Sequence, residues 1–122
     1  MATEAVVAAA YPNVRRWPRY KLRVPLRVVL HKPTKTQIVD GRGTELNEGG
    51  MAVFAGAEIS MGEHVEVEFT PPYTGQPIRV RCEVRHRTGY TYGVAFLLLD
   101  HHDERQVAQI REVLRAMGSP AA

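Results

Sequence analysis

Residues 78–98 read IRVRCEVRHRTGYTYGVAFLL and contain the most regular pattern in the chain. From Ile78 onward, apolar residues occupy every second position and alternate with arginine and glutamate. This period of two is typical of a strand with one buried and one solvent-facing side. Thr88-Gly89 is a turn signal, and a second apolar segment follows at residues 90–98. The stretch predicts an antiparallel hairpin, with His86 continuing the inward face of its first strand.

The segments before this hairpin show the same kind of pattern between turn signals. They predict four further strands, at residues 22–30, 36–46, 51–55 and 64–69. Asn47-Glu48-Gly49-Gly50 and Met61-Gly62 are the turn signals that separate three of them. Pro25 lies inside the earliest strand, and because proline has no N–H to donate, we expect a free edge or a bulge there.

The end of the chain has a different period. Four apolar residues recur at helical spacing, namely Val107, Ile110, Leu114 and Met117. Asp100 or Asp103 is the candidate N-cap, and Gly118 lies beyond the last turn. About six short strands followed by one amphipathic helix are typical of a small barrel or a strongly bent antiparallel sheet. The expected fold class is therefore mainly β.

Length and composition indicate one globular domain of 122 residues, of which 44% are hydrophobic and 24% charged. We expect a flexible N-terminal tail at residues 1–14, the domain at 15–117 and a C-terminal tail at 118–122. The longest apolar run is far shorter than the roughly 18 residues of a membrane span, and the start lacks the features of a secretory signal. We therefore expect a cytoplasmic protein without membrane insertion. Cys82 is the single cysteine, which excludes an internal disulfide.

Positive charge is concentrated near the N-terminus. The first 39 residues contain one carboxylate, Glu4, and the cations Arg15, Arg16, Arg19, Lys21, Arg23, Arg27, Lys32 and Lys35. This asymmetry favours an anionic partner, such as a nucleotide, a nucleic acid or an acidic protein.

Two short segments hold the candidate binding residues. Residues 15–20 read RRWPRY, and guanidinium groups of this kind bind phosphate or the O6/N7 edge of guanine and stack on bases. Alone, such a segment is more often a solvated run of charge. Trp17 and Tyr20 can stack on purines or anchor the segment to the barrel. Residues 45–50 read ELNEGG, which taken alone is equally typical of a hairpin turn.

In combination these segments resemble the PilZ domain. The resemblance rests on an R-x-x-x-R pair just before a strand, a Gly-containing polar turn about 25 residues later, and YGVAF at residues 92–96. It extends from about Arg15 to Leu114. It implies a six-stranded antiparallel β-barrel with a C-terminal α-helix. It also implies a bacterial receptor for the second messenger cyclic di-GMP, which needs no cofactor.

The resemblance also implies the binding residues. In the family, the two arginines of R-x-x-x-R contact guanines and phosphates, and the second motif is usually written (D/N)-x-S-x-x-G. The implied ligand-binding residues are Arg15, Arg16, Arg19, Glu45, Asn47 and Gly50, with Arg16 as an adjacent helper. Glu45 departs from the pattern by one methylene, and Asn47 replaces a hydroxyl with an amide that can still donate to phosphate. Gly50 lets backbone approach a ligand, because it has no Cβ.

Two other binding functions stay open. A degenerate PilZ-like adaptor would have lost nucleotide affinity through Glu45 and Asn47 and would act by protein–protein interaction, although Arg15 and Arg19 are intact. A barrel for single-stranded nucleic acid would need a basic and aromatic stripe, and the polar faces after Gly43 are mixed or acidic. We therefore expect no nucleic-acid partner. We do expect a downstream protein partner.

The sequence does not predict an enzyme. It has no nucleophile elbow, no phosphate-binding P-loop and no carboxylate pair in a recognisable acid–base setting. The His101-His102-Asp103 run is the strongest metal candidate, but adjacent side chains point apart, and a helix cap on a solvated surface is the better interpretation. We expect no metal site.

Overall fold

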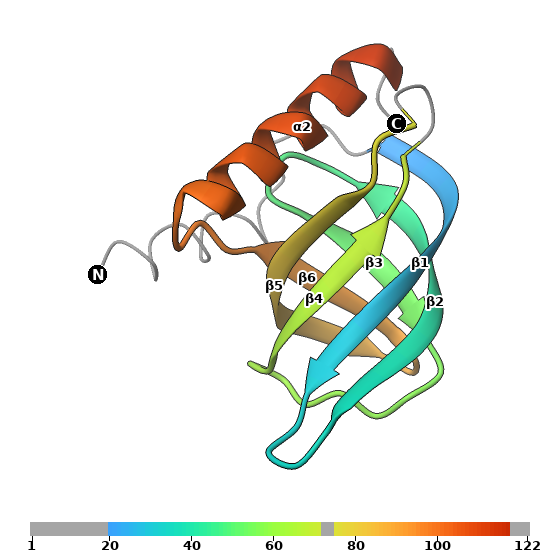
Figure 1. Cartoon of the computed structure of the whole chain (residues 1–122). Helices are drawn as coiled ribbons and strands as arrows, with labels where there is room; N and C mark the ends of the chain where they lie inside the picture. Colours follow the sequence, from blue (N-terminus) through green and yellow to red (C-terminus); the bar gives the residue numbers. More distant parts are fainter. Residues whose placement is uncertain (1–19, 72–74, 118–122) are drawn as a thin grey trace.

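The computed structural model describes residues 20–71 and 75–117. Within them, antiparallel strands close into a barrel in the order β1-β2-β3-β6-β5-β4, and one helix follows (Figure 1). The elements are β1 (Tyr20–His31), β2 (Thr36–Leu46), β3 (Gly50–Ala55), β4 (His64–Phe69), β5 (Ile78–Thr88), β6 (Thr91–Phe96) and α2 (His101–Met117). The six-stranded barrel with a C-terminal helix is confirmed. The expected tails at 1–14 and 118–122 lie outside the described residues.

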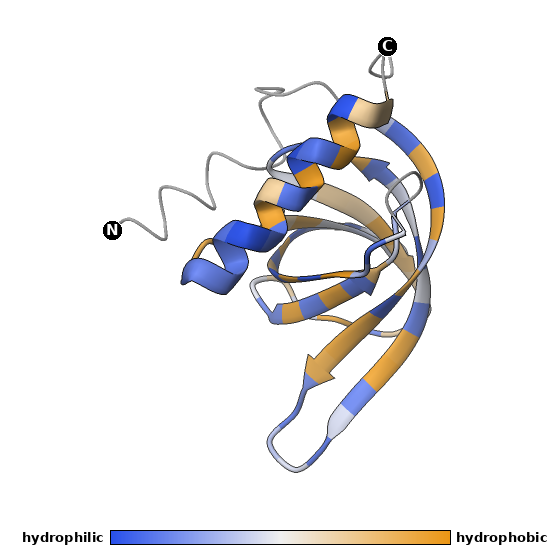
Figure 2. Cartoon of the chain, turned by 45° about the horizontal axis from the view of Figure 1, so that its top comes forward, coloured by the Kyte–Doolittle hydropathy of each residue, from blue (hydrophilic) through white to orange (hydrophobic). Residues whose placement is uncertain are grey.

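The barrel interior is filled by the alternating apolar side chains of the strands. Leu30, Met51, Val67, Val80 and Tyr92 are among the side chains that are almost completely buried. Figure 2 shows the alternation of hydrophobic and hydrophilic residues along the strands. Burial of each such side chain contributes about 1.5–3 kcal/mol, so the period of two is the main determinant of the barrel.

Cys82 belongs to this core. Its side chain is completely buried, and burial raises the pKa of its thiol. The thiol therefore stays protonated and unreactive.

Three irregularities interrupt the ladders. Register shifts lie between Lys21 and Val24 on β1, between Gly43 and Glu45 on β2, and between Val84 and His86 on β5. The β1–β4 pairing begins only at Leu26, so the free edge expected as one alternative at Pro25 is confirmed, whereas the bulge lies before it, between Lys21 and Val24.

The shift on β5 corrects the prediction for His86. The side chain of His86 is exposed and does not continue the inward face. An extra residue in one strand reverses the side on which the following side chains lie, and the period of two cannot reveal where that happens.

Helix α2 lies against the barrel (Figure 1). Its apolar side faces inward, with Val107, Ile110 and Leu114 buried. Asp100 is the N-cap, because its Oδ1 accepts the N–H of Asp103 at 3.0 Å. Asp103 has a different role in the first turn. It is completely buried and accepts hydrogen bonds from Arg81 of β5, at 3.0 Å from Nε and 2.9 Å from a terminal nitrogen.

No helix in the described part of the chain is long and apolar enough to cross a membrane.

Candidate functional site

Asn47 organises the turn between β2 and β3. Its side-chain Oδ1 accepts the N–H groups of Gly49 at 2.7 Å and Gly50 at 2.8 Å, and its own N–H donates to the Gly50 carbonyl at 3.0 Å. The side chain is buried. This pattern is an Asx turn, in which the asparagine side chain replaces a backbone acceptor.

The same bonds determine what Asn47 can offer to a ligand. Oδ1 is occupied by the turn, whereas Nδ2 has no partner among the described residues. In that part of the chain no fully buried side-chain nitrogen or oxygen lacks a partner, and Asn47 is 6% exposed, so Nδ2 is not fully enclosed. Asn47 can therefore donate a hydrogen bond outward while its oxygen holds the turn.

Gly50 is required by the pairing of β3 with β6. It lies opposite Ala95, and a Cβ at this position would be 2.1 Å from the carbonyl oxygen of Val94. Its N–H is already bonded to Asn47. Packing alone thus accounts for a glycine here, a reason that the sequence motif does not reveal.

Glu45 lies just after the β2 bulge, half-buried, with its side chain on the outside of the barrel because neighbouring Leu46 points inward. It is opposite Lys21 of β1 and Ala52 of β3. Ala52 in turn is opposite Gly93 of β6. Residues directly opposite in a ladder share a face, so small residues form a flat surface beside the Glu45 carboxylate.

Arg15, Arg16 and Arg19 lie outside the described residues. The described chain begins at Tyr20, which is opposite Leu46, one residue before Asn47. Tyr20 is half-buried and packs against the hydrophobic core, as expected for an anchor. Glu45, Asn47 and Gly50 are thus together at one turn, and the strand that follows the arginine segment begins beside them.

Sequence reasoning missed a contact between this turn and the helix. Glu48, inside the turn, forms an ion pair with Arg111 of α2 at 3.5 Å. Both side chains are substantially exposed, at 41% and 48%, so the pair contributes about 0–1 kcal/mol at most. Only the spacing of Arg111 on the helix could have suggested it.

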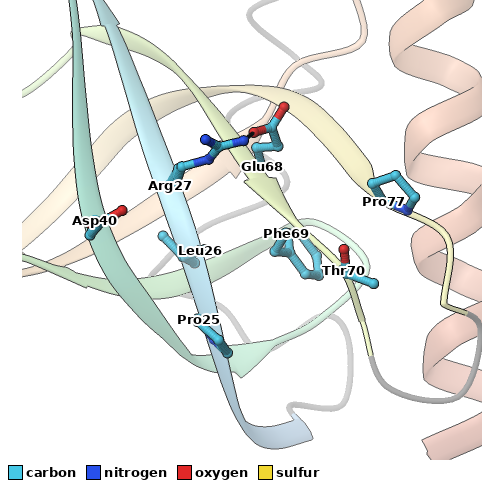
Figure 3. Close-up of a pocket in the computed structure, with 8 residues that line it drawn as sticks. All are labelled: Pro25, Leu26, Arg27, Asp40, Glu68, Phe69, Thr70 and Pro77. Atoms are coloured by element: carbon cyan, nitrogen blue, oxygen red, sulfur yellow. Dashed lines mark hydrogen bonds and ion pairs between the residues drawn. The ribbon is translucent and has the colours of Figure 1, made fainter.

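A surface pocket of about 560 Å³ lies elsewhere on the barrel (Figure 3). Its walls come mainly from β1, β2 and β4, and they comprise Pro25, Leu26, Arg27, Asp40, Glu68, Phe69, Thr70 and Pro77. Arg27 and Glu68 are joined by an ion pair at this pocket. Glu45, Asn47 and Gly50 do not line it, so the pocket is distinct from the predicted motif.

The histidine run is not arranged as a metal site. Asp103 is occupied by Arg81, and His101 contacts Glu104 at 3.2 Å. Among residues 20–71 and 75–117, no group of three or more histidine, cysteine, aspartate or glutamate side chains could hold a metal ion.

Comparisons with known proteins identify the fold. The PilZ domain of CeSA from a cellulose-synthesizing bacterium is 20% identical, with a TM-score of 0.54, over 81% of this chain and 93% of that one. The PilZ domain of YcgR from Escherichia coli, solved with cyclic di-GMP, is 18% identical, with a TM-score of 0.56, over 85% and 94%. The Bacillus subtilis inhibitor of motility (MotI/DgrA) is 15% identical, with a TM-score of 0.58, over 86% and 52%.

A comparison with curated proteins finds no match. The family model of the PilZ domain, however, matches residues 13–112, which include the arginine segment, the whole barrel and most of the helix. With this match over most of its length, the chain belongs to the PilZ domain family.

Proposed function

We propose that the chain is a receptor for cyclic di-GMP, which binds on the outside of the barrel at the β2–β3 turn. The binding residues are Arg15, Arg16 and Arg19 with Glu45, Asn47 and Gly50. The observation that carries the proposal is that Tyr20 lies opposite Leu46. Arg19 is covalently joined to Tyr20, so the R-x-x-x-R segment ends one residue before the strand position that lies beside the Asn47 turn. The PilZ domain of YcgR was solved with cyclic di-GMP, which supports the choice of this ligand.

The chemistry of the turn suits a guanine nucleotide. The Glu45 carboxylate can accept the N1–H and N2–H₂ donors of guanine, and Nδ2 of Asn47 can donate to a phosphate. Ala52 and Gly93 are opposite each other and have small side chains or none, so a planar base can lie flat on the outer surface over them. The arginines supply the positive charge that two bridging phosphates require.

The binding event needs a recipient of the signal. We therefore include in the proposal a downstream protein partner and a location in the bacterial cytoplasm, where the second messenger is made.

A second candidate is an adaptor without nucleotide affinity. The Asn47 and Gly50 geometry favours it, because both residues have structural reasons to be present even without a ligand. The two functions differ in one measurable quantity, the affinity for cyclic di-GMP.

The test is a calorimetric titration of the full chain with cyclic di-GMP, with GTP and cyclic di-AMP as control ligands. Arg15→Ala and Arg19→Ala should each weaken binding at least tenfold, because charge-assisted hydrogen bonds contribute about 1.5–3 kcal/mol each. The matched control is Arg105→Ala, which removes an exposed helical arginine and should leave affinity unchanged. Absence of binding by the unmodified protein would favour the adaptor.

A further inference from the structure

Most arginines on the strands are paired with carboxylates. The paired ones are Arg27 with Glu68, Arg79 with Glu66, Arg81 with Asp103, Arg85 with Glu83 and Arg87 with Glu58. The exceptions are Arg23 of β1 and Arg42 of β2, for which no carboxylate of residues 20–71 or 75–117 lies within ion-pair distance. Both are exposed. Positive charge is therefore left uncompensated on one part of the outer surface.

The uncompensated cations lie next to an exposed aromatic side chain. Arg42 is opposite Phe54 of β3, and Phe54 is opposite Thr91 of β6. Phe54 is 47% exposed, so its ring faces solvent instead of the core. Directly opposite side chains have Cβ atoms about 4.5–5.5 Å apart, which brings the Arg42 and Phe54 side chains side by side. Asp40, also exposed, lies two residues from Arg42 on β2, and the structure shows no ion pair between them.

This pair is continuous with the candidate nucleotide site. Phe54 is two residues beyond Ala52 on the same face of β3, a spacing of about 7 Å. Arg42 precedes Glu45 on β2, and the bulge lies between the two residues. Arg23 faces outward within the β1 bulge, between Lys21 and Val24. Glu45, Ala52, Arg42 and Phe54 therefore lie on the same outer face of the barrel, with Gly93 beside Ala52.

We propose that Arg42 and Phe54 form a guanine subsite, distinct from the positions of the family motif, in which Phe54 stacks on the base and Arg42 donates to its O6 and N7. Arg23 contributes positive charge for the adjoining phosphate. A cyclic dinucleotide has two bases, so one guanine binds Glu45 and the other binds Arg42 and Phe54. This inference rests on the proposed function, because it assigns the second base of the same ligand.

The chemistry favours guanine over adenine at this subsite. The guanidinium group presents paired donors, which match the two acceptors on the O6/N7 edge of guanine. Adenine has an amino group in place of O6, so one donor of Arg42 would face another donor. Arg42 is therefore a specificity-determining residue, whereas Phe54 stacks on any purine.

The experiment is calorimetric titration of the full chain and its variants with cyclic di-GMP and cyclic di-AMP. Arg42→Ala and Phe54→Ala should each weaken cyclic di-GMP binding about tenfold or more. Arg42→Ala should also reduce the ratio of the two affinities, whereas Phe54→Ala should weaken both ligands alike. The control is Arg79→Ala, since Arg79 is equally a strand arginine but is paired with Glu66 on the β4–β5 side of the barrel. Circular dichroism checks that each variant is folded.

The outcomes separate this inference from the proposed function. If Arg19→Ala abolishes binding while Arg42→Ala and Phe54→Ala bind as the unmodified protein does, the subsite is wrong and the receptor function stands. If Arg42→Ala weakens both ligands equally, the assignment of Arg42 to the base edge is wrong. If the unmodified protein binds no cyclic di-GMP, both proposals fail.

Discussion

Replacement of Arg81 by methionine should destabilise the protein more than loss of any other ion pair described here. Arg81 donates to Asp103 from Nε at 3.0 Å and from a terminal nitrogen at 2.9 Å, and Asp103 is completely buried. Without Arg81, the Asp103 carboxylate would keep the hydrogen bond from the backbone N–H of Leu99, which is 2.9 Å from its Oδ2. Leaving a buried charge without its partner costs about 3–5 kcal/mol.

The loss can be measured by chemical and thermal denaturation. For a chain of 122 residues, 1 kcal/mol corresponds to a shift in Tm of about 4 °C, so Arg81→Met should lower the Tm by more than about 10 °C. Arg85→Met is the matched control, because Arg85 lies on the same strand and pairs with Glu83 near the surface at 3.7 Å. That variant should lose no more than about 1 kcal/mol.

A double variant identifies the cause. Arg81→Met with Asp103→Leu removes both charges and should recover much of the lost stability, because an apolar pair of similar volume can replace a buried ion pair. If Arg81→Met is within about 1 kcal/mol of the unmodified protein, the Arg81–Asp103 pair does not hold α2 to the barrel, and the reasoning is refuted.

Three further predictions concern the turn and the helix cap. Asn47→Ala should reduce the free energy of unfolding by about 1–3 kcal/mol, because the N–H groups of Gly49 and Gly50 lose their acceptor; denaturation curves unchanged by it would refute the Asx turn. Glu45→Gln should weaken cyclic di-GMP binding about tenfold while Glu45→Asp binds at least as well, and calorimetry showing neither effect would remove Glu45 from the site. The hydrogen bond from the Asp103 N–H, together with Arg81, holds the pKa of the Asp100 carboxyl below its usual range despite partial desolvation. Ionised Asp100 therefore stabilises α2 at any pH above its pKa in the unfolded chain, and this stabilisation is lost as the pH falls through the lower pKa of the folded state. The stability difference from Asp100→Asn should therefore be constant near neutral pH and shrink below about pH 4, and a difference that persists there would contradict the assignment.

The sequence predicted the elements of this fold because their patterns are local. The alternation from Ile78 onward and the helical spacing from Val107 to Leu114 reflect burial that each segment shows by itself. The ends were less accurate, with β1 predicted at residues 22–30 and observed at Tyr20–His31. The pairing of β1 with β4 that closes the barrel could not be predicted from periodicity, because the alternation within a strand does not identify which distant strand it pairs with.

The site was predictable in part for the same reason. Glu45, Asn47 and Gly50 are contiguous in sequence, so one turn necessarily brings them together. Whether Arg42 has a carboxylate partner on the described strands depends on which residues those strands place opposite it, and this is a property of register. The choice between Asp100 and Asp103 as N-cap likewise required the position of Arg81 on β5, which no helical pattern contains.

The central claim is that cyclic di-GMP binds outside the barrel at the β2–β3 turn, and an NMR titration tests it most directly. Backbone amide signals of the ¹⁵N-labelled full chain are followed as cyclic di-GMP is added, with GTP as the control ligand. We expect the largest shifts at Glu45, Asn47 and Gly93, and small shifts at Val67 and Glu68 of β4, on another part of the barrel. Saturating ligand that leaves the Glu45, Asn47 and Gly93 amides unmoved, or moves only those around Glu68 and Thr70 at the surface pocket, would contradict the claim.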